Sequence, residues 1–329
     1  MISVHFTEKP RGVRPVVQRG PNYIFHLLAV ARVGFAGEYA ERYSDTVAQD
    51  DTGALKRLAE FLQLTPGCEG ALAFLTVLLP AYLNLDSQVK ITDYFSYLND
   101  GLQSCNCFRF FNRYREGFAR QRKWMYDVDH QWIADNHCDY AEEIAQLADI
   151  YARNYPPFEY WVWPTESRNL REVSARLNRL LADQPLIPQW QEMTGEAFEF
   201  SRFEIVLCAA NEQGPPASTL GYDRTLFYYR HQEENLLECV SHEVGTHLLS
   251  AVFRKVCSGT PADCRHLCCA CENLARHYNA VLLGRNPAYD TSEADVYAGL
   301  YRDLHRSQPE ATPEQLLRAA LRETAAAEP

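Results

Sequence analysis

Apolar residues recur at helical spacing through the first half of the chain. From about Tyr23 to Ala152 they return every three or four positions, as in the groups Leu27–Ala31 and Leu55–Leu62. This period is that of amphipathic helices with one face in a core. Pro80 lies inside one apolar run, where we expect it to end or kink the helix. The pattern predicts an all-helical N-terminal domain over residues 1–154.

The helical pattern is interrupted at Tyr155–Tyr160, which reads YPPFEY. Proline lacks a backbone N–H and pushes the residue before it towards extended backbone. We therefore expect a domain junction here and a second domain over residues 155–329. After a helix from about Asn169 to Leu181, two β-rich runs, Phe203–Ala209 and Thr225–Arg230, are predicted as strands. Strands followed by long helices indicate an α+β fold, predominantly helical, with a small sheet.

Composition narrows the class of protein. The chain has 329 residues, of which 47% are apolar, and a formal net charge of −11. The apolar share is enough for a buried core and excludes a disordered or fibrous protein. The acidic balance argues against a nucleic-acid partner. Neither a signal peptide nor an apolar run that could cross a bilayer is recognised, so no membrane association is expected.

The 11 cysteines do not follow the paired spacing of structural zinc sites. An odd number in a chain of this length also does not indicate a disulfide framework, so we expect a reduced, cytoplasmic protein. Cys264, Cys268 and Cys271 recur at i, i+4 and i+7, which favours core packing over a second metal site. A run of arginines and aromatic residues over 108–124 is interpreted as an amphipathic helix with a solvated basic face, rather than a site for an acidic peptide.

The segment His242–His247, which reads HEVGTH, carries the candidate chemistry. It lies on a predicted helix that opens with the capping pattern Asn235–Glu238 and ends at Cys257. In the HExxH motif the histidines are four residues apart, about 40° around a helix, and share one zinc ion. Here they are five apart, which is about 140° on a regular helix. A π-bulge, which Gly245 tolerates, would bring both rings to one face.

A second helix should begin after Thr260-Pro261 and end at Gly284. So short a turn predicts an antiparallel helical hairpin, and Glu272 is as far after the turn as His247 is before it. Two histidines and a glutamate that leave a coordination position open are the ligands of a catalytic zinc site. Glu243 would then be the general base that takes a proton from zinc-bound water.

A simpler interpretation competes with this one. His242 and His247 are then ordinary helix residues, while Glu243 and Glu272 are solvated. Should Glu272 not be the third ligand, Glu293 and Asp295 are the reserve candidates.

Two segments resemble the tubulin-tyrosine carboxypeptidase family and its bacterial relatives, which are gluzincin-like metallopeptidases. HEVGTH is similar to their HE[IV]GTH signature, and Glu272–Ala275 (ENLA) resembles their EGLA-like segment, with Asn273 in place of glycine. YPPFEY is similar to a P-x-F-x-Y stretch that precedes their catalytic domain. The resemblance implies a zincin-like domain with one Zn²⁺ ion on His242, His247 and Glu272, and it implies that Glu243 is catalytic.

The expected function is that of a zinc-dependent peptidase of the carboxypeptidase type, acting on a peptide or protein. Tyr228 and Tyr278 are candidate donors to the developing oxyanion, and Arg230 is a candidate partner of the substrate carboxylate. Two alternatives stay open. Two histidines and a carboxylate also describe the triad of non-haem iron oxygenases, and a catalytically inactive binding protein could retain the fold.

Overall fold

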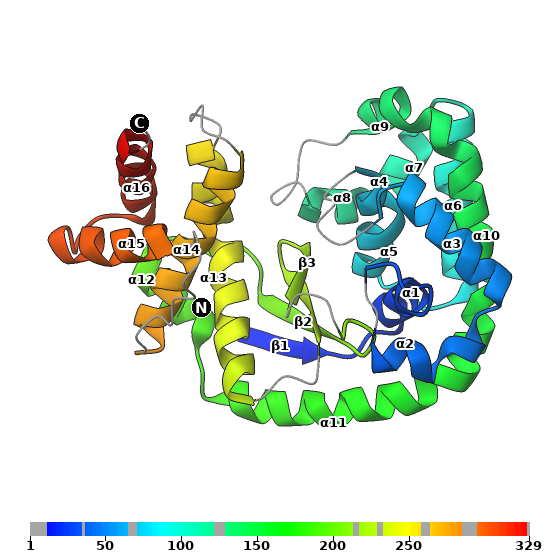
Figure 1. Cartoon of the computed structure of the whole chain (residues 1–329), viewed down its shortest axis with the longest axis horizontal. Coiled ribbons are helices and arrows are strands. Elements are labelled where there is room, and N and C mark those ends of the chain that lie inside the picture. The colour runs from blue at the N-terminus through cyan, green and yellow to red at the C-terminus, as the bar shows by residue number, and fades with distance from the viewer. Residues whose placement is uncertain are drawn as a thin grey trace, which may run out of the picture. The chain divides into compact units, whose positions relative to one another are not determined.

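The computed structural model describes residues 12–34, 37–64, 71–121, 129–212, 217–228, 233–257, 264–284 and 295–327. Over these ranges the chain is mostly helical with one four-stranded sheet, which confirms the predicted α+β class (Figure 1). It divides into two compact units: unit 1 (Met1–Val13, Leu180–Phe203 and Glu233–Pro329) and unit 2 (Arg14–Arg179 and Glu204–Gln232). No described helix is both long and apolar enough to cross a membrane.

The division into units differs from the predicted single junction at residue 155. Tyr155 lies inside unit 2, within helix α10 (Ala141–Pro157). The chain remains helical beyond it, through the π-helical turn η4 (Phe158–Val162) and the helix α11 (Trp163–Ala182). The expected interruption of the helical pattern at YPPFEY is therefore wrong. The predicted helix from Asn169 to Leu181 is present and begins earlier, at Trp163.

Proline is tolerated at the end of α10 because a neighbouring helix replaces the hydrogen bond that it cannot make. Pro156 has no N–H to offer the carbonyl of Ala152, four residues earlier. That carbonyl accepts instead from Gln88 Nε2, at 2.9 Å. Gln88 opens α6 (Gln88–Gln103), which packs against α10. The backbone acceptor is thereby satisfied and the helix continues.

Pro80 is accommodated in a similar way. It follows the π-helical turn η2 (Phe74–Leu78) and lies in α5 (Leu79–Tyr82). In a π-helix each N–H bonds the carbonyl five residues back, which for position 80 is Leu75. The buried Tyr94 hydroxyl donates to this carbonyl at 2.6 Å. The expected disturbance at Pro80 is thus a π-helical turn rather than an end of the helix.

The remaining helical elements of unit 2 surround an aromatic core. They are α1 (Arg19–Val30), α2 (Glu38–Arg42), η1 (Ser44–Thr46), α3 (Gln49–Phe61), α4 (Ala71–Ala73), α7 (Phe108–Arg113), α8 (Arg115–Gln121), α9 (His130–His137) and η3 (Cys138–Tyr140). The predicted basic helix over 108–124 is therefore two short helices, α7 and α8, whose arginines are exposed while Phe110 and Phe118 are buried. Residues 122–124 lie outside the described residues.

The sheet has the order β1-β2-β4-β3. Its strands are β1 (Gly12–Val16), β2 (Arg202–Cys208), β3 (Ala217–Gly221) and β4 (Arg224–Tyr228). The strands β2 and β4 are parallel and β3 pairs antiparallel with β4. Both predicted strands are confirmed as β2 and β4, although residues 229 and 230 lie outside the described residues. The strands β1 and β3 were not predicted.

A side chain of α1 is joined to the end of β2 within unit 2. The buried Asn22 donates from Nδ2 to the carbonyl of Leu207 at 2.8 Å, and its Oδ1 accepts from the amide of Ala209 at 3.0 Å. Asn22 thus satisfies backbone groups at the end of the strand, much as a neighbouring strand would.

Unit 1 contains the predicted helical hairpin. The described helices of unit 1 are α12 (Leu186–Thr194), α13 (Glu233–Cys257), α14 (Cys264–Leu282), α15 (Asp295–Ser307) and α16 (Pro313–Ala327). The helices α13 and α14 pack against each other (Figure 1). The predicted end at Cys257 is confirmed, and Gly284 has a φ of 62° where the second helix was expected to stop. The turn itself, 258–263, lies outside the described residues.

Candidate functional site

His242 and Glu272 meet across the helical hairpin. His242 lies on α13 and Glu272 on α14, and His242 Nε2 is 2.9 Å from Glu272 Oε1. The same carboxylate oxygen accepts from Arg276 Nε at 3.3 Å, one turn along α14. The hairpin therefore brings together two of the three residues that the sequence nominated as metal ligands.

The pKa values of this pair are shifted in a coupled way. Burial would lower the pKa of His242, but the hydrogen bond and the negative charge of Glu272 outweigh it and raise the pKa. Burial would raise the pKa of Glu272, yet the hydrogen bond and charge of His242, together with Arg276, lower it. Each group thus favours the charged form of the other.

His247 has a different environment from His242. Its side chain is completely buried, and its ring packs edge-to-face on Phe203 with 4.8 Å between ring centroids. Its Nε2 is 3.9 Å from Oε2 of Glu243, one turn earlier on α13. The two histidines of the motif therefore have different acidic neighbours. Glu272 of α14 lies beside His242, and Glu243 of the motif lies nearest to His247.

The separation of the two histidines follows from the regularity of α13. The helix is α-helical from Glu233 to Cys257, so five residues turn by about 140°. The π-bulge that both histidines would need in order to share one metal ion is absent from this helix. The predicted register is also displaced, because Glu272 contacts His242 and not His247. Across the described residues, no three His, Cys, Asp or Glu side chains are grouped to hold a metal ion.

Gly245 serves close packing rather than a bulge. A Cβ atom on Gly245 would lie 2.2 Å from Cη2 of Trp190, on α12. The indole of Trp190 is also held by α13, because its Nε1 donates to the Oγ of Ser241 on that helix at 3.0 Å. Only glycine allows the ring to approach α13 so closely. The helix α12 was not predicted, although Leu186, Ile187 and Trp190 have the helical spacing that would have revealed it.

Thr246 supports His242 directly. Its Oγ1 donates to the His242 carbonyl at 3.0 Å and lies 3.4 Å from His242 Nε2. A hydroxyl that bonds the carbonyl four residues back is a familiar local arrangement in helices. The Gly-Thr pair of the motif therefore has a structural role in which glycine admits Trp190 and threonine orients His242.

The three predicted substrate-binding residues do not gather at this pair in the described part of the chain. Tyr278 is buried in α14, with ring contacts to Trp190 and His305. Burial raises the pKa of its hydroxyl well above the ordinary value, so it is a core residue. Tyr228 belongs to unit 2, where its hydroxyl is 3.2 Å from Oε1 of Glu212. Arg230 lies outside the described residues.

The reserve ligands remain without a structural test. Glu293 lies outside the described residues, and Asp295 is the first residue of α15, with no side-chain description.

The predicted cysteine stripe on α14 is only partly buried. Cys271 is buried, as predicted, and its Sγ contacts Cys257 at the end of α13. Cys268 is exposed, which contradicts its predicted place in the core, and Cys264 has no described side chain. All nine described cysteines are free thiols.

The donor atoms of His242, His247 and Glu272 are of the types that bind zinc, but their positions do not yet form a three-ligand site. Imidazole nitrogens and a carboxylate oxygen are ordinary zinc ligands, and two of these donor atoms already lie 2.9 Å apart. His247 is the donor that would have to turn towards them. The zinc site therefore stays a prediction, with two of its three ligands in contact.

Comparisons with known proteins leave the resemblance to metallopeptidases untested. The chain matches no protein-family model, and neither the curated proteins nor the solved structures gave a match. The candidate site therefore rests on its own geometry.

Proposed function

We propose that this protein is a zinc-dependent peptidase of the carboxypeptidase type, related to the tubulin-tyrosine carboxypeptidases. His242, His247 and Glu272 would hold one zinc ion, and Glu243 would be the general base. The observation that carries the proposal is the contact of His242 Nε2 with Glu272 Oε1 at 2.9 Å between two helices. Zinc can replace the proton that a half-buried histidine shares with a carboxylate, because metal binding releases protons from its ligands.

Each residue of the site would have a separate role. Bound zinc would polarise the scissile carbonyl and lower the pKa of a water molecule. Glu243 would take a proton from the attacking water and deliver it to the leaving amine. Arg276 would keep the Glu272 carboxylate ionised and oriented, because it already shares Oε1 with His242. Thr246 would orient the imidazole of His242.

A three-ligand site requires a local change in α13. Its regular geometry keeps His247 about 140° from His242, and a π-helical turn would reduce this angle. The same chain forms π-helical turns at η2 and η4. Zinc should therefore alter amide hydrogen exchange in α13, between residues 242 and 247, and leave the exchange of α16 unchanged.

The decisive experiment combines metal analysis with a peptide library. Protein purified without added metal should carry about one zinc ion per chain and remove C-terminal residues, as read by mass spectrometry. Glu243→Gln should retain zinc and lose hydrolysis. Glu192→Gln, a matched change at an exposed glutamate of α12, should retain both. Hydrolysis by Glu243→Gln at the parental rate would contradict the role of this residue.

The same measurements separate the alternatives. Bound iron together with oxygen consumption would replace the peptidase by an oxygenase. A Glu272→Ala variant that binds zinc as tightly as the parent would exclude Glu272 as a ligand.

A further inference from the structure

The outer side of α11 and of the π-helical turn η4 carries a continuous row of exposed residues in unit 2. This row, here called the α11 stripe, consists of Tyr160, Trp161, Pro164, Arg168, Arg171, Ala175 and Arg179. At about 1.5 Å per residue it extends over about 28 Å. The opposite side of α11 is buried through Leu170 and Leu177. The stripe is therefore the solvent face of an amphipathic helix.

Two large aromatic side chains occupy one end of the stripe. Tyr160 is 75% exposed and Trp161 is 69% exposed, and their ring centroids are 5.1 Å apart. Exposing two adjacent aromatic rings to water is unfavourable unless a partner covers them. Both residues lie in the π-helical turn η4, and such turns are frequent at functional sites.

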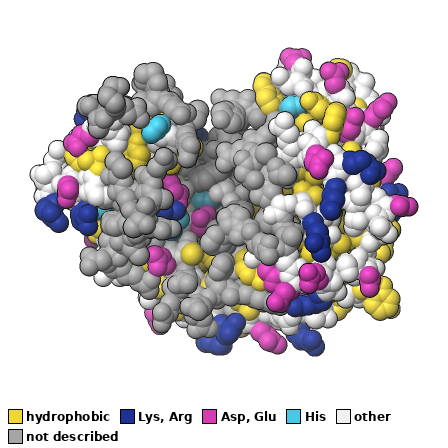
Figure 2. All heavy atoms as spheres, in the orientation of Figure 1, with side chains coloured by type: hydrophobic (Ala, Val, Ile, Leu, Met, Phe, Trp, Pro, Cys, Tyr) yellow, Lys and Arg dark blue, Asp and Glu magenta, His cyan; other side chains and the backbone are white. Residues whose placement is uncertain are grey.

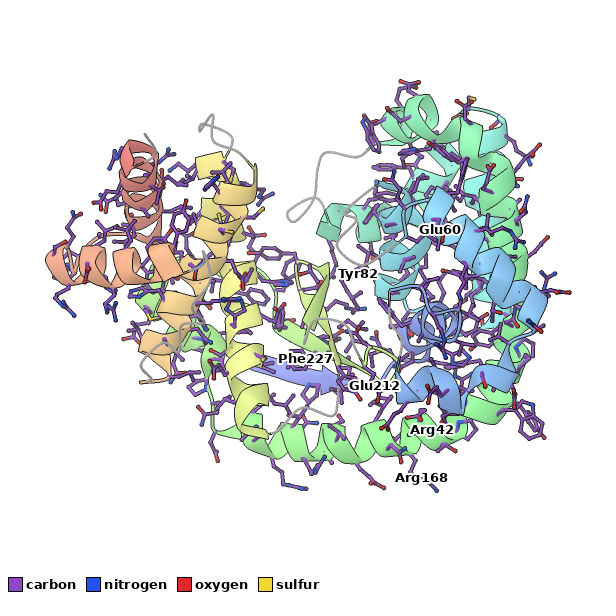
Figure 3. All side chains as sticks on the ribbon, viewed as in Figure 1. Arg42, Glu60, Tyr82, Arg168, Glu212 and Phe227 are labelled. Carbon is purple, nitrogen blue, oxygen red and sulfur yellow. The ribbon has the colours of Figure 1, made fainter. Side chains whose placement is uncertain are left out.

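The remainder of the stripe is cationic, and its cations are all arginine. No residue in the described part of the chain forms an ion pair with Arg168, Arg171 or Arg179. The side chain of Arg168 points away from the body of unit 2 (Figure 3). Basic side chains, with acidic ones between them, lie along the lower edge of the space-filling view, along which α11 runs (Figure 2). Glu172 is the one acidic neighbour within this face of α11.

We propose that the α11 stripe binds an acidic helical segment of a partner protein. Arginine pairs with carboxylates through two parallel hydrogen bonds, which lysine cannot form. Tryptophan, tyrosine and arginine are also the residues that contribute most to protein–protein binding. The aromatic end would contact an apolar side chain of the partner, while Arg168, Arg171 and Arg179 pair with carboxylates about two to five turns further along.

The distribution of charge on the protein favours a single acidic helix as the partner over a membrane or a nucleic acid. The protein has a net charge of −11, so a membrane or a nucleic acid would meet repulsion from the rest of the molecule. A single helix laid along the stripe contacts its three arginines and avoids most of that repulsion. The inference is independent of the proposed metal site, because every residue of the stripe lies in unit 2.

The test uses the full chain and a fluorescein-labelled helical peptide of about 18 residues, which spans about 27 Å. The peptide carries glutamates at every third or fourth position and leucines at one end, and fluorescence anisotropy measures its binding. The double variants Arg168→Glu/Arg171→Glu and Tyr160→Ser/Trp161→Ser should each weaken binding by about tenfold or more. Arg168→Lys/Arg171→Lys keeps the charge but should still weaken binding several-fold. Lys56→Glu/Arg57→Glu, an equal charge change on the exposed face of α3, should leave binding unchanged.

Two outcomes would overturn the proposal. One is equal binding of the peptide by the parent and by both stripe variants. The other is failure of the peptide to bind while vesicles containing phosphatidylserine, or a DNA duplex, bind the parent through Arg168 and Arg171. Circular dichroism of every variant identifies those that are folded, and only the folded variants are compared.

Discussion

At the scale of single residues, Gly245 shows how a motif position can be fixed by packing. An added Cβ would lie 2.2 Å from the Trp190 ring. In Gly245→Ala, overpacking should cost about 3 kcal/mol and the better helix propensity of alanine should return about 1 kcal/mol. We expect a net loss of about 2 kcal/mol in the free energy of unfolding, measured by urea titration.

A matched glycine provides the control for this substitution. Gly299 lies within α15, and a Cβ there would meet only the end of the flexible Arg302 side chain, at 3.8 Å. Gly299→Ala should therefore stabilise the protein by up to about 1 kcal/mol. Equal effects of the two substitutions would refute the packing argument.

We expect His26 to make the stability of the protein dependent on pH. Its ring is completely buried, with Nδ1 3.0 Å from the Tyr39 hydroxyl and Nε2 3.2 Å from Thr46 Oγ1. Burial lowers its pKa from 6.5 to about 3. Between these values the unfolded chain binds a proton at His26 that the folded chain does not. Stability should therefore fall on acidification from about pH 6.5 towards pH 3, by up to about 1.4 kcal/mol per pH unit from this residue.

The measurement is the free energy of unfolding at several pH values. His26→Gln should lower stability at neutral pH but have a shallower loss on acidification than the parent. An unchanged slope in His26→Gln would show that other groups determine the pH dependence.

At the scale of elements, the π-helical turn before Pro80 depends on a hydroxyl from another helix. Removing the Tyr94 hydroxyl leaves the buried Leu75 carbonyl without this donor, which should cost about 1–3 kcal/mol. In a Pro80→Ala background the backbone N–H of position 80 becomes available to the same carbonyl. Tyr94→Phe should therefore cost less in that background, which a double-mutant cycle measures directly.

Tyr97, which is partly buried and lies on α6 as Tyr94 does, provides the control. Its ring lies against Arg113, and Tyr97→Phe should leave the free energy of unfolding almost unchanged. Additive effects of Tyr94→Phe and Pro80→Ala would mean that the hydroxyl does not substitute for the missing amide.

Elements with a strong local signal could be predicted from the sequence. The strand β2 is mostly apolar and includes the β-branched Ile205 and Val206, and α13 has recognisable ends, so these two elements were located to within two residues, as was the end of α14. The strands β1 and β3 were missed because their sequences, GVRPV and ASTLG, are short and have little apolar alternation. The continuity of α10 could not be predicted, because it depends on Gln88, far away in the sequence.

The candidate site was predictable in its residue types but not in its pairing. Helical spacing and turn position placed Glu272 on the helix opposite the motif, where it contacts His242. The exact partner depends on the register of two helices, which a turn of unknown conformation does not fix. The π-bulge expected in α13 was inferred only from the need to bring two histidines together, and the Trp190 ring against Gly245 was not visible in the sequence.

At the scale of the whole molecule, the division into units predicts which fragments fold. Residues 1–154 contain most helices of unit 2 but lack β2, whose end is hydrogen-bonded to Asn22. We expect the fragment 1–154 to lack a cooperative thermal transition and to bind a hydrophobic dye. The fragment 14–232, which contains all of unit 2, should unfold cooperatively in the same circular dichroism experiment. Cooperative unfolding of the fragment 1–154 would restore the boundary at residue 155.

The two hydrogen bonds of Asn22 also impose an order in time. On the ribosome, Asn22 is synthesised long before Leu207 and Ala209, the residues that receive its carboxamide. At about 5–20 residues per second, the wait from residue 22 to residue 209 is roughly 10–40 s. During that interval the carboxamide and the apolar face of α1 have no strand to cover them. We therefore expect this protein to need a chaperone most during the interval in which its helical half has been synthesised and β2 has not.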